Sequence, residues 1–263
     1  MSFKGKVVIV TGSSSGIGQD LAVLMATEGA MVTIHGQSTE RLKKTMDLLT
    51  KNNVCTNTKI LQVEGPIEKE ETRQKLIDET IKKFGRLDVL VNNAGLSHRN
   101  DLGDPNSLEN LDYVMAVNVK SLIAITRLAV PHLEKTKGNV VNVSSVGSTW
   151  PVISLTPYQL TKAAVDHYTR NAANEYADKG IRVNAVRPGC IETNFGTRHG
   201  ELSPESLQFY DHIAKNIPMQ RFGSPREVSN MIAFLASDKA SYVTGSLMVV
   251  DGGLLCGPPQ PKK

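Results

Sequence analysis

The sequence predicts an α/β protein, a single doubly wound domain whose seven-stranded parallel sheet has helices on both faces. Short apolar runs rich in β-branched residues alternate with longer amphipathic runs along the chain. These strand candidates are continuously apolar, which is typical of a parallel sheet buried on both faces. A turn rich in glycine and serine follows the first strand candidate directly and precedes the first helical pattern. Together these observations predict strand–helix–strand units with right-handed crossovers.

The elements follow one another in a regular order. The strand candidates are residues 7–10, 31–35, 59–63, 87–92, 139–144, 181–187 and 246–250. The helical patterns lie near residues 17–28, 39–51, 68–84, 107–134, 158–178 and 225–237. The last helix has a clear start, because Ser224 suits an N-cap, Pro225 the first helical position and Glu227 a capping box.

No internal repeat or low-complexity linker divides the chain. We therefore expect one domain over residues 1–263. The longest irregular region, about residues 190–224, is expected to be a functional loop over a ligand, although a plain surface loop is the alternative. We expect the tail at about residues 257–263 to be disordered.

The composition excludes several classes of protein. The chain has 30 Lys and Arg against 26 Asp and Glu, few aromatic residues and no basic run of five, which argues against a nucleic-acid partner. Three widely spaced cysteines, Cys55, Cys190 and Cys256, argue against a disulfide framework and for a reducing compartment. No apolar stretch approaches the roughly 20 residues of a membrane span, and the first residues do not form a signal peptide. We therefore expect a cytoplasmic protein without a membrane span or a metal site.

The segment TGSSSGIG, residues 11–18, carries the first chemical signal. Gly12 permits a tight turn, while Gly16 and Gly18 let the backbone approach a pyrophosphate and let the helix pack on the strand. An ordinary strand-to-helix turn is the alternative. The order strand, turn, helix favours dinucleotide binding, and no lysine follows as in a P-loop.

Two further polar segments end the fourth and fifth strand candidates. They are NNAG, residues 92–95, and NVSSVGS, residues 142–148. Because ligands bind beyond the carboxyl ends of parallel strands, we expect both asparagine amides and a serine to border one crevice. Either segment alone is also explained as a turn or a strand end.

Tyr158 and Lys162 are four residues apart at the start of a helical pattern, so that both lie on one helix face. A phenol with a pKa of about 10 needs help worth about 4 kcal/mol to act as a base at neutral pH. A unit charge about 4 Å away supplies on the order of 4 kcal/mol at an effective dielectric near 20. The pair is chemically sufficient, although such a pair is more often an ordinary helix surface.

Taken in order, TGSSSGIG, NNAG, Asn118, Ser145, YQLTK (158–162) and RPGCIET (187–193) resemble the classical short-chain dehydrogenase/reductase family, which has a Rossmann fold. The resemblance covers about residues 4–253. It implies an NAD(P)-dependent oxidoreductase that is a homodimer or homotetramer.

The resemblance also implies a catalytic set. Tyr158 is the acid/base, and Lys162 lowers its pKa and binds the nicotinamide ribose. Ser145 holds the substrate oxygen, and we prefer it to Ser144 because it lies thirteen residues before Tyr158. Asn118 anchors a water that relays protons from Lys162 to solvent.

The cofactor set follows in the same way. The implied cofactor-binding residues are Gly12, Ser14, Ser15, Gly16, Ile17, Gly18, Gln37, Ser38, Arg41, Ile67, Asn93, Ala94, Gly95, Tyr158, Lys162, Pro188, Gly189, Ile191 and Thr193. In this family the backbone at Ile191 and the hydroxyl of Thr193 fix the carboxamide.

Two positions depart from the family's pattern. No Asp or Glu stands at Gly36, where a carboxylate would hold a free ribose 2′-hydroxyl, and no carboxylate is expected to repel a 2′-phosphate there. Gln37, Ser38 and Arg41 could bind that phosphate, so we favour NADP(H) over NAD(H). Pro66 replaces an aspartate that contacts adenine, which leaves the backbone of Ile67.

We expect hydride transfer between nicotinamide and a secondary alcohol/ketone pair, as in a carbonyl reductase. Trp150 and its apolar neighbours suggest a hydrophobic substrate, held with Ser145 and Tyr158. The main alternative is a non-catalytic NAD(P)-binding sensor or scaffold protein. A sugar-nucleotide epimerase or dehydratase and an enoyl reductase are further alternatives.

Overall fold

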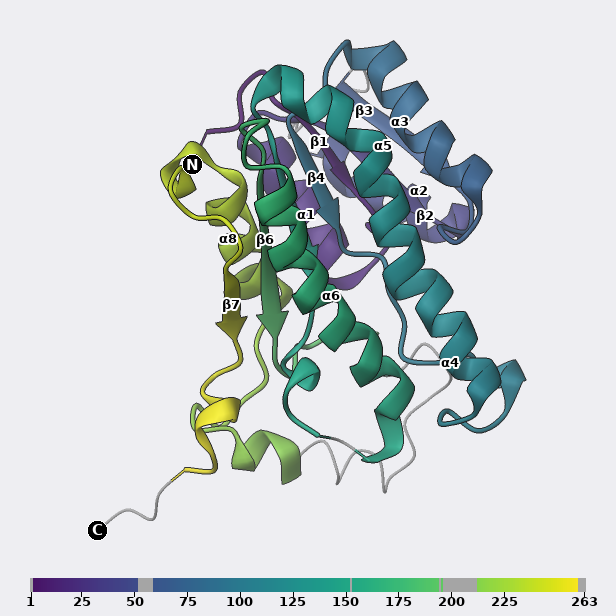
Figure 1. Ribbon diagram of the computed structural model, residues 1–263, viewed down its shortest axis with the longest axis vertical. Coiled ribbons are helices and arrows are strands. Elements are labelled where there is room, and N and C mark those ends of the chain that lie inside the picture. The colour runs from purple at the N-terminus through teal and green to yellow at the C-terminus, as the bar shows by residue number, and fades with distance from the viewer. Residues whose placement is uncertain (1, 52–58, 152, 194, 196–211, 260–263) are drawn as a thin grey trace.

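The computed structural model describes all residues except 1, 52–58, 152, 194, 196–211 and 260–263. Within these described residues, seven strands form one parallel sheet in the order β3-β2-β1-β4-β5-β6-β7 (Figure 1). The strands are β1 (Val7–Val10), β2 (Met31–Gly36), β3 (Ile60–Glu64), β4 (Val89–Asn92), β5 (Asn139–Val143), β6 (Arg182–Pro188) and β7 (Leu247–Val250). The predicted fold class is confirmed.

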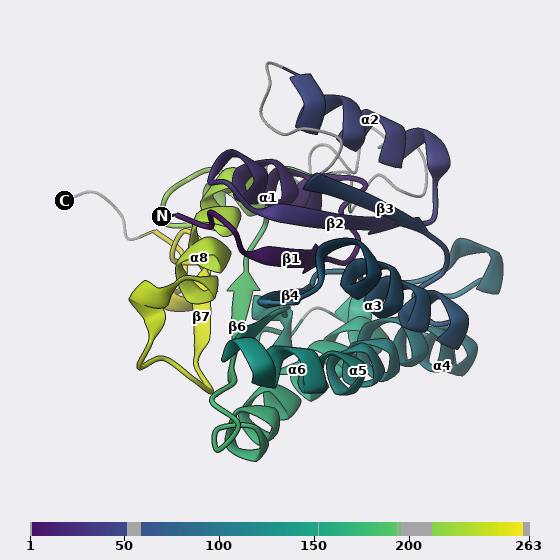
Figure 2. The ribbon, with the colours of Figure 1, turned by 90° about the horizontal axis from the view of Figure 1, so that it is seen from above.

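Helices cover both faces of the sheet (Figure 2). The α-helices are α1 (Gly16–Thr27), α2 (Thr39–Thr50), α3 (Glu70–Phe84), α4 (Leu108–Met115), α5 (Ser121–Thr136), α6 (Thr156–Glu175) and α8 (Pro225–Ala236). Short 3-10 helices cover Asn100–Leu102, Val146–Ser148, Ile153–Leu155, Asp238–Ala240 and Leu254–Cys256. Helices α1, α2 and α8 lie on one face of the sheet, and α3, α5 and α6 lie on the other.

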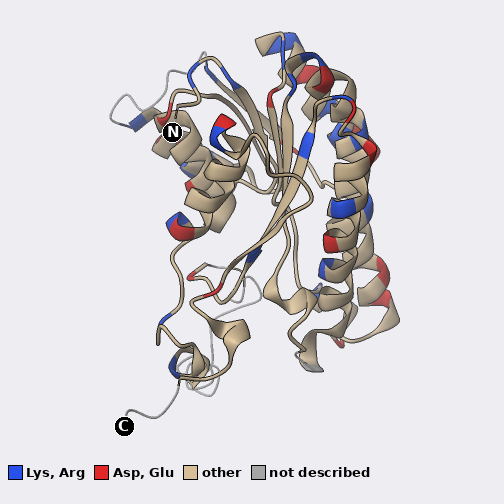
Figure 3. Cartoon of the chain, turned by 60° about the vertical axis from the view of Figure 1, so that its left-hand side comes forward, with Lys and Arg blue, Asp and Glu red and all other residues tan. Residues whose placement is uncertain are grey.

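Two hydrophobic layers hold the sheet between these helices. One layer joins Val8 and Val10 of β1 to α1 and α8, and the other joins Val7 and Ile9 to α3 and α5. Because alternate residues of β1 point to opposite faces and are all apolar, both faces of this strand are buried. Charged side chains gather on the outer helices and loops (Figure 3).

The predicted helix over residues 107–134 is not one regular α-helix. Its first part is α4 and its second part is α5, and a π-helical turn, Ala116–Lys120, lies between them. The run Leu108–Thr136 is long and apolar enough to cross a membrane, but half of its apolar 18-residue window is buried inside this fold. A helix that covers a sheet passes the same test of length and apolarity.

Some predictions fall partly outside the described residues. Cys55 and most of the region 194–211 lie outside them, as do residues 260–263 of the tail. In the described part, Cys190 and Cys256 are free thiols. The predicted capping box of α8 is present, since the Ser224 N–H donates to the Glu227 carboxylate over 2.7 Å.

Candidate active site

The predicted site residues converge on the carboxyl edge of the sheet. The strand order runs outward from β1 to β3 on one side and from β4 to β7 on the other. The loops after β1 and β4 therefore diverge at this point, where doubly wound sheets have a crevice for a ligand.

The glycine turn after β1 is crowded enough to exclude side chains. Gly12 has φ 65°, a left-handed conformation that favours glycine. A Cβ at Gly18 would lie 2.4 Å from the Asn93 side-chain nitrogen and 2.5 Å from the Gly12 carbonyl oxygen. Helix α1 begins at Gly16, so the N–H groups of its first turn face the crevice edge and suit an anionic group.

The NNAG segment supports this turn from β4. The Asn93 amide donates to the carbonyl oxygens of Thr11 (2.9 Å) and Gly12 (3.0 Å). The Thr11 hydroxyl oxygen in turn accepts from the backbone N–H groups of Asn93 and Ala94. Asn93 and Ala94 thus lie beside the glycine turn and fix its carbonyl groups.

The prediction that both asparagine amides border the crevice is wrong for Asn92. Its amide is buried and donates to Asn142 (2.9 Å) and Thr126 (3.0 Å). Successive residues of a strand point to opposite faces, so the amide of the last residue of β4 is directed into the helix layer.

Tyr158 and Lys162 lie on α6 and face the end of β5. The Lys162 ammonium donates to the Val143 carbonyl oxygen over 2.8 Å and lies 5.5 Å from the centre of the Tyr158 ring. Pro157 stands in the first turn of α6, where its missing N–H has no helical partner to lose. The Lys162 side chain is 5% exposed.

The predicted lowering of the tyrosine pKa is not found in this arrangement. Burial raises the pKa of Tyr158 to about 12, and a side-chain hydrogen bond with Ser145 opposes this only in part. Burial also lowers the pKa of Lys162 to about 8, opposed by the charge of Asp166. The expectation was wrong because the sequence does not show burial, and because the ammonium is bonded to a carbonyl rather than to the phenol.

The two adjacent serines at the end of β5 differ in direction. The Ser145 hydroxyl oxygen accepts from the Gly147 N–H over 3.0 Å and is paired with Tyr158. Ser144 is buried, and its hydroxyl donates to the Lys162 carbonyl over 3.3 Å. Ser145 is therefore the serine that lies beside the tyrosine, as sequence spacing predicts.

Asn118 lies in the π-helical turn between α4 and α5, at 1% exposure. Its amide accepts from the Leu96 N–H (3.0 Å) and donates to the Leu96 carbonyl (2.9 Å) and the Thr161 hydroxyl (3.0 Å). A Cβ at Gly95 would lie 3.2 Å from Asn118 and 3.6 Å from the Lys162 nitrogen. Both amide hydrogens are already used, so a water here would bond to the remaining oxygen lone pair or to the backbone.

The segment after β6 approaches the glycine turn. A Cβ at Gly16 would lie 3.2 Å from the Thr193 methyl group, and the Gly189 N–H donates to the Val250 carbonyl. Ile191 forms an isolated parallel bridge with Gly223. Pro188 ends β6 at the same edge, so the four predicted cofactor residues of this segment stand at or just after the carboxyl end of β6, and Thr193 lies against the glycine turn.

Two aromatic residues lie near the start of α6, which carries Tyr158. The Phe195 ring lies 5.7 Å from the Tyr158 ring, centre to centre. Trp150 packs partly buried beside Ile217 and Leu254, and its carbonyl accepts from the Gln159 amide. Sequence analysis proposed Trp150 but did not single out Phe195, whose position depends on the path of the loop.

At the ribose end, Gln37 precedes α2, Ser38 is its N-cap and Arg41 lies in its first turn. The Ser38 hydroxyl oxygen accepts from the Arg41 N–H over 3.3 Å. The expectation that no carboxylate lies here is wrong, because Glu64 pairs in register with Gly36 and accepts from the Thr39 hydroxyl over 2.8 Å. Only the register between β2 and β3 brings Glu64 to this corner.

The loop after β3 contains Ile67, whose backbone is predicted to contact adenine. Ile67 is buried, and its carbonyl accepts from the Arg73 guanidinium over 2.9 Å. Ser14 and Ser15 lie between the glycines, and the Ser14 side chain covers Gly36, where a Cβ would lie 2.7 Å from it. Ile17 packs on the core below the turn.

Comparisons with known proteins agree with this geometry. The profile of the family described as "Enoyl-(Acyl carrier protein) reductase" matches residues 12–255. The chain is 38% identical to the 3-oxoacyl-[acyl-carrier-protein] reductase FabG of Thermotoga maritima, over 97% of this chain and 100% of that protein. It is also 38% identical to glucose 1-dehydrogenase 2 of Bacillus subtilis, over 97% of each chain. The crystal structure of a short-chain dehydrogenase/reductase of unknown function from Caenorhabditis elegans, solved with cofactor, superposes with a TM-score of 0.92, at 37% identity over 97% of this chain and 96% of that one.

Proposed function

The chain belongs to the short-chain dehydrogenase/reductase family and is an NAD(P)-dependent oxidoreductase, and we propose that it interconverts a secondary alcohol and a ketone with Tyr158 as acid/base. The observation that carries this proposal is the convergence of Tyr158, Ser145 and Lys162 at the crevice edge. The FabG and glucose dehydrogenase relatives bear names that describe C=O/C–OH chemistry.

The residues present fit a dinucleotide cofactor. The turn packs so tightly on Ala94 and Asn93 that a Cβ is excluded at Gly12 and Gly18, and a turn without side chains at these positions suits the close approach of a pyrophosphate. The first turn of α1 directs its N–H groups to the same place. When bound there, the nicotinamide supplies or accepts the hydride.

Tyr158 would supply the proton. With a pKa of about 12, its phenol is almost fully protonated at neutral pH and can donate to a carbonyl oxygen. The Ser145 hydroxyl is bonded to the phenol and would hold the same substrate oxygen. Reduction would use this phenol as the acid, whereas oxidation would require the phenolate as the base.

Lys162 would stabilise charge beside the phenol. Its ammonium is buried 5.5 Å from the ring centre, so its field is poorly screened there. To stabilise the phenolate that is left when Tyr158 gives its proton to substrate, this ammonium would have to turn from the Val143 carbonyl toward the phenol. The Asn118 amide donates to the hydroxyl of Thr161, the residue directly before Lys162, and would connect Lys162 to solvent through a water.

We propose NADP(H) rather than NAD(H), with a small preference. The support is the absence of an acidic residue at Gly36 and the presence of Arg41 at the start of α2. Glu64 acts against it, since its carboxylate lies at the same corner.

We propose a hydrophobic ketone as the substrate, because Trp150 and Phe195 border the tyrosine segment. We also propose a cytoplasmic homodimer or homotetramer. Its support is the exposure of Leu160 on α6 (52%) and Leu108 on α4 (74%), which a second subunit would cover.

The test follows nicotinamide absorbance with NADPH and NADH against a panel of ketones, enoyl thioesters and sugars, with wild type and Tyr158→Phe in parallel. Ketone-dependent oxidation of the cofactor that the substitution abolishes supports the proposal. Reduction of the enoyl C=C bond instead would favour the activity in the family description. Cofactor binding without turnover would favour a sensor or scaffold, and an active Tyr158→Phe variant would overturn the mechanism.

A further inference from the structure

His35 is a buried histidine that sequence analysis did not single out. It lies near the end of β2 and is 2% exposed. Its ring stands between the glycine turn after β1 and the loop after β3, two segments that border the crevice on its adenosine side.

Both ring nitrogens are hydrogen-bonded to backbone groups. The Gly12 N–H donates to Nδ1 over 3.1 Å, and Nε2 lies 3.0 Å from the Gly65 carbonyl oxygen. An N–H group only donates and a carbonyl oxygen only accepts, so Nδ1 carries no hydrogen and Nε2 carries one. The partners therefore require one neutral tautomer.

The two glycines that the ring joins are both in unusual conformations. Gly12 has φ 65° and Gly65 has φ 148°, and a Cβ at Gly65 would lie 2.5 Å from the Thr72 hydroxyl oxygen. Such conformations persist when surrounding contacts hold them. The ring fixes one end of each segment to the same point of β2.

The backbone of His35 strengthens the same junction. Its N–H donates to the Ser13 hydroxyl oxygen over 2.8 Å, and its carbonyl accepts from the Ser13 N–H over 2.8 Å. The neighbouring Gly65 N–H donates to the Gly36 carbonyl. The strand and the two loops thus form one bonded unit with the imidazole at its centre.

We propose that His35 is a positioning residue for the cofactor, whose neutral ring sets the glycine turn and the Gly65 loop at a fixed separation. This inference rests on the proposed dinucleotide site. The ring is hydrogen-bonded to the Gly12 and Gly65 backbone and to neither Tyr158 nor Lys162, so it acts on cofactor affinity rather than on the chemical step.

Two substitutions separate the two ring bonds. His35→Asn keeps an acceptor near the Nδ1 position and loses the bond to Gly65. His35→Gln keeps a donor near the Nε2 position and leaves the Gly12 N–H without its acceptor. Equivalent changes at His132, a half-buried histidine of α5, are the matched controls.

The first readout is the Kd for NADPH and NADH, measured by cofactor fluorescence, together with kcat at saturating cofactor. Loss of one buried hydrogen bond is expected to raise Kd about tenfold in each His35 variant. The value of kcat should change less than about twofold, since the proton-transfer groups are untouched. A His35 variant that binds as tightly as wild type would overturn the positioning role.

The second readout needs no cofactor. Amide hydrogen exchange at Gly12 should be faster in His35→Gln than in wild type, and slower in His35→Asn than in His35→Gln. Equal exchange in all three proteins would overturn the inference even where stability has changed. If the wild type binds neither NADPH nor NADH, the proposed function is overturned. If the wild type binds and only the His35 variants bind more weakly, the proposed function stands and the positioning role is supported.

Discussion

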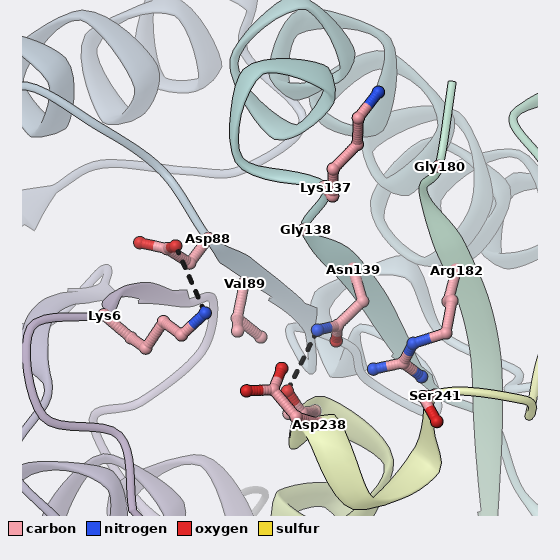
Figure 4. Close-up of a pocket in the computed structure, with 11 residues that line it drawn as sticks. Lys6, Asp88, Val89, Lys137, Gly138, Asn139, Gly180, Arg182, Asp238 and Ser241 are labelled. Carbon is pink, nitrogen blue, oxygen red and sulfur yellow. Dashed lines mark hydrogen bonds and ion pairs between the residues drawn. The ribbon is translucent and has the colours of Figure 1, made fainter.

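The two edges of the one parallel sheet use similar polar residues for different purposes. At the amino edge, a cavity of about 210 Å³ is lined by charged side chains, among them Lys6, Asp88, Lys137, Arg182 and Asp238 (Figure 4). At the carboxyl edge, Lys162 and Tyr158 lie among serine, glycine and asparagine residues. Both edges bury charge, but only one of them presents groups suited to a reaction.

At the amino edge the charges are satisfied by the chain itself. The Arg182 guanidinium donates to the carbonyl oxygens of Leu235 and Val243, at 2.9 and 3.2 Å, and to that of Ser237 at 3.2 Å. Asp88 accepts from the Val7 N–H over 2.9 Å and is also bonded to a neighbouring arginine.

The difference follows from the direction of the helices. In strand–helix–strand units, helix C-termini with unpaired carbonyls lie at the amino edge, and helix N-termini with unpaired N–H groups lie at the carboxyl edge. A cation on the chain, Arg182, satisfies the carbonyls at the end of α8. The N–H groups at the start of α1 instead suit an anion from outside the chain. Helix direction thus explains why the amino edge contributes to stability and the carboxyl edge suits ligand binding.

The largest expected effect that tests this comparison is at the carboxyl edge. Tyr158→Phe should lower kcat by about a thousandfold, in line with the loss of a general acid. The free energy of unfolding should change little, because the ring and its burial are kept. Steady-state kinetics and urea denaturation check the two expectations together, and a large loss of stability would contradict the separation of the two edges.

At the amino edge the expectation is reversed. Arg182→Ala should lower the free energy of unfolding by about 3 kcal/mol, because it leaves buried carbonyl groups without donors. Arg182→Lys keeps the positive charge, so its free energy of unfolding should fall by less. Urea denaturation measures the loss, while the Kd for NADPH should stay within about twofold of wild type by the proposed separation.

His35, at the carboxyl edge, should make the free energy of unfolding depend on pH. Burial lowers its pKa from 6.5 to about 4 in the fold. The unfolded chain therefore takes up a proton first as the pH falls, so the stabilisation from neutral His35 is complete above pH 6.5 and lost by about pH 4. The loss should be about 3 kcal/mol.

This loss is measured by urea denaturation of wild type and His35→Asn at pH 7.0, 5.5 and 4.0. The gap between the two proteins should narrow toward acid pH. An equal gap at all three pH values would show that His35 contributes no protonation-linked stability.

The smallest expected effect concerns Lys162, whose pKa of about 8 places its deprotonation within the working range. If the ammonium is the active form, kcat/KM should fall above about pH 8. In Asp166→Asn, the fall of kcat/KM at alkaline pH should begin at a lower pH, by on the order of one pH unit, because the Asp166 charge raises the pKa of Lys162. A pH profile that is the same in both proteins would contradict this coupling.

The sequence was sufficient for the parts of the fold that repeat a local pattern. All seven strands were predicted within about two residues, because each is a short apolar run between helical patterns. The capping box at Ser224 and Glu227 is a local signal of the same kind. The glycine turn, Ser145 and Tyr158 could be placed at one edge because a parallel sheet brings carboxyl ends together.

The remaining features depend on contacts between distant segments. Glu64 reaches the ribose corner only through strand register, and His35 joins two loops that the sequence does not show to be neighbours. The raised pKa of Tyr158 follows from burial. The π-helical turn at Asn118 changes the hydrogen-bond spacing without changing the apolar pattern, so the sequence predicted one continuous helix.

The π-helical turn Ala116–Lys120 also changes the orientation of α4 relative to α5 about the helix axis. Each residue of an α-helix advances the chain by about 100°, so one extra residue in a turn rotates everything before it by roughly that angle. Helix α4 packs on α6, whereas α5 packs on α3. Removing one residue from the turn would restore a regular helix and rotate α4 away from α6. Asn118 lies in this turn, and its side chain is directed inward to the backbone of Leu96.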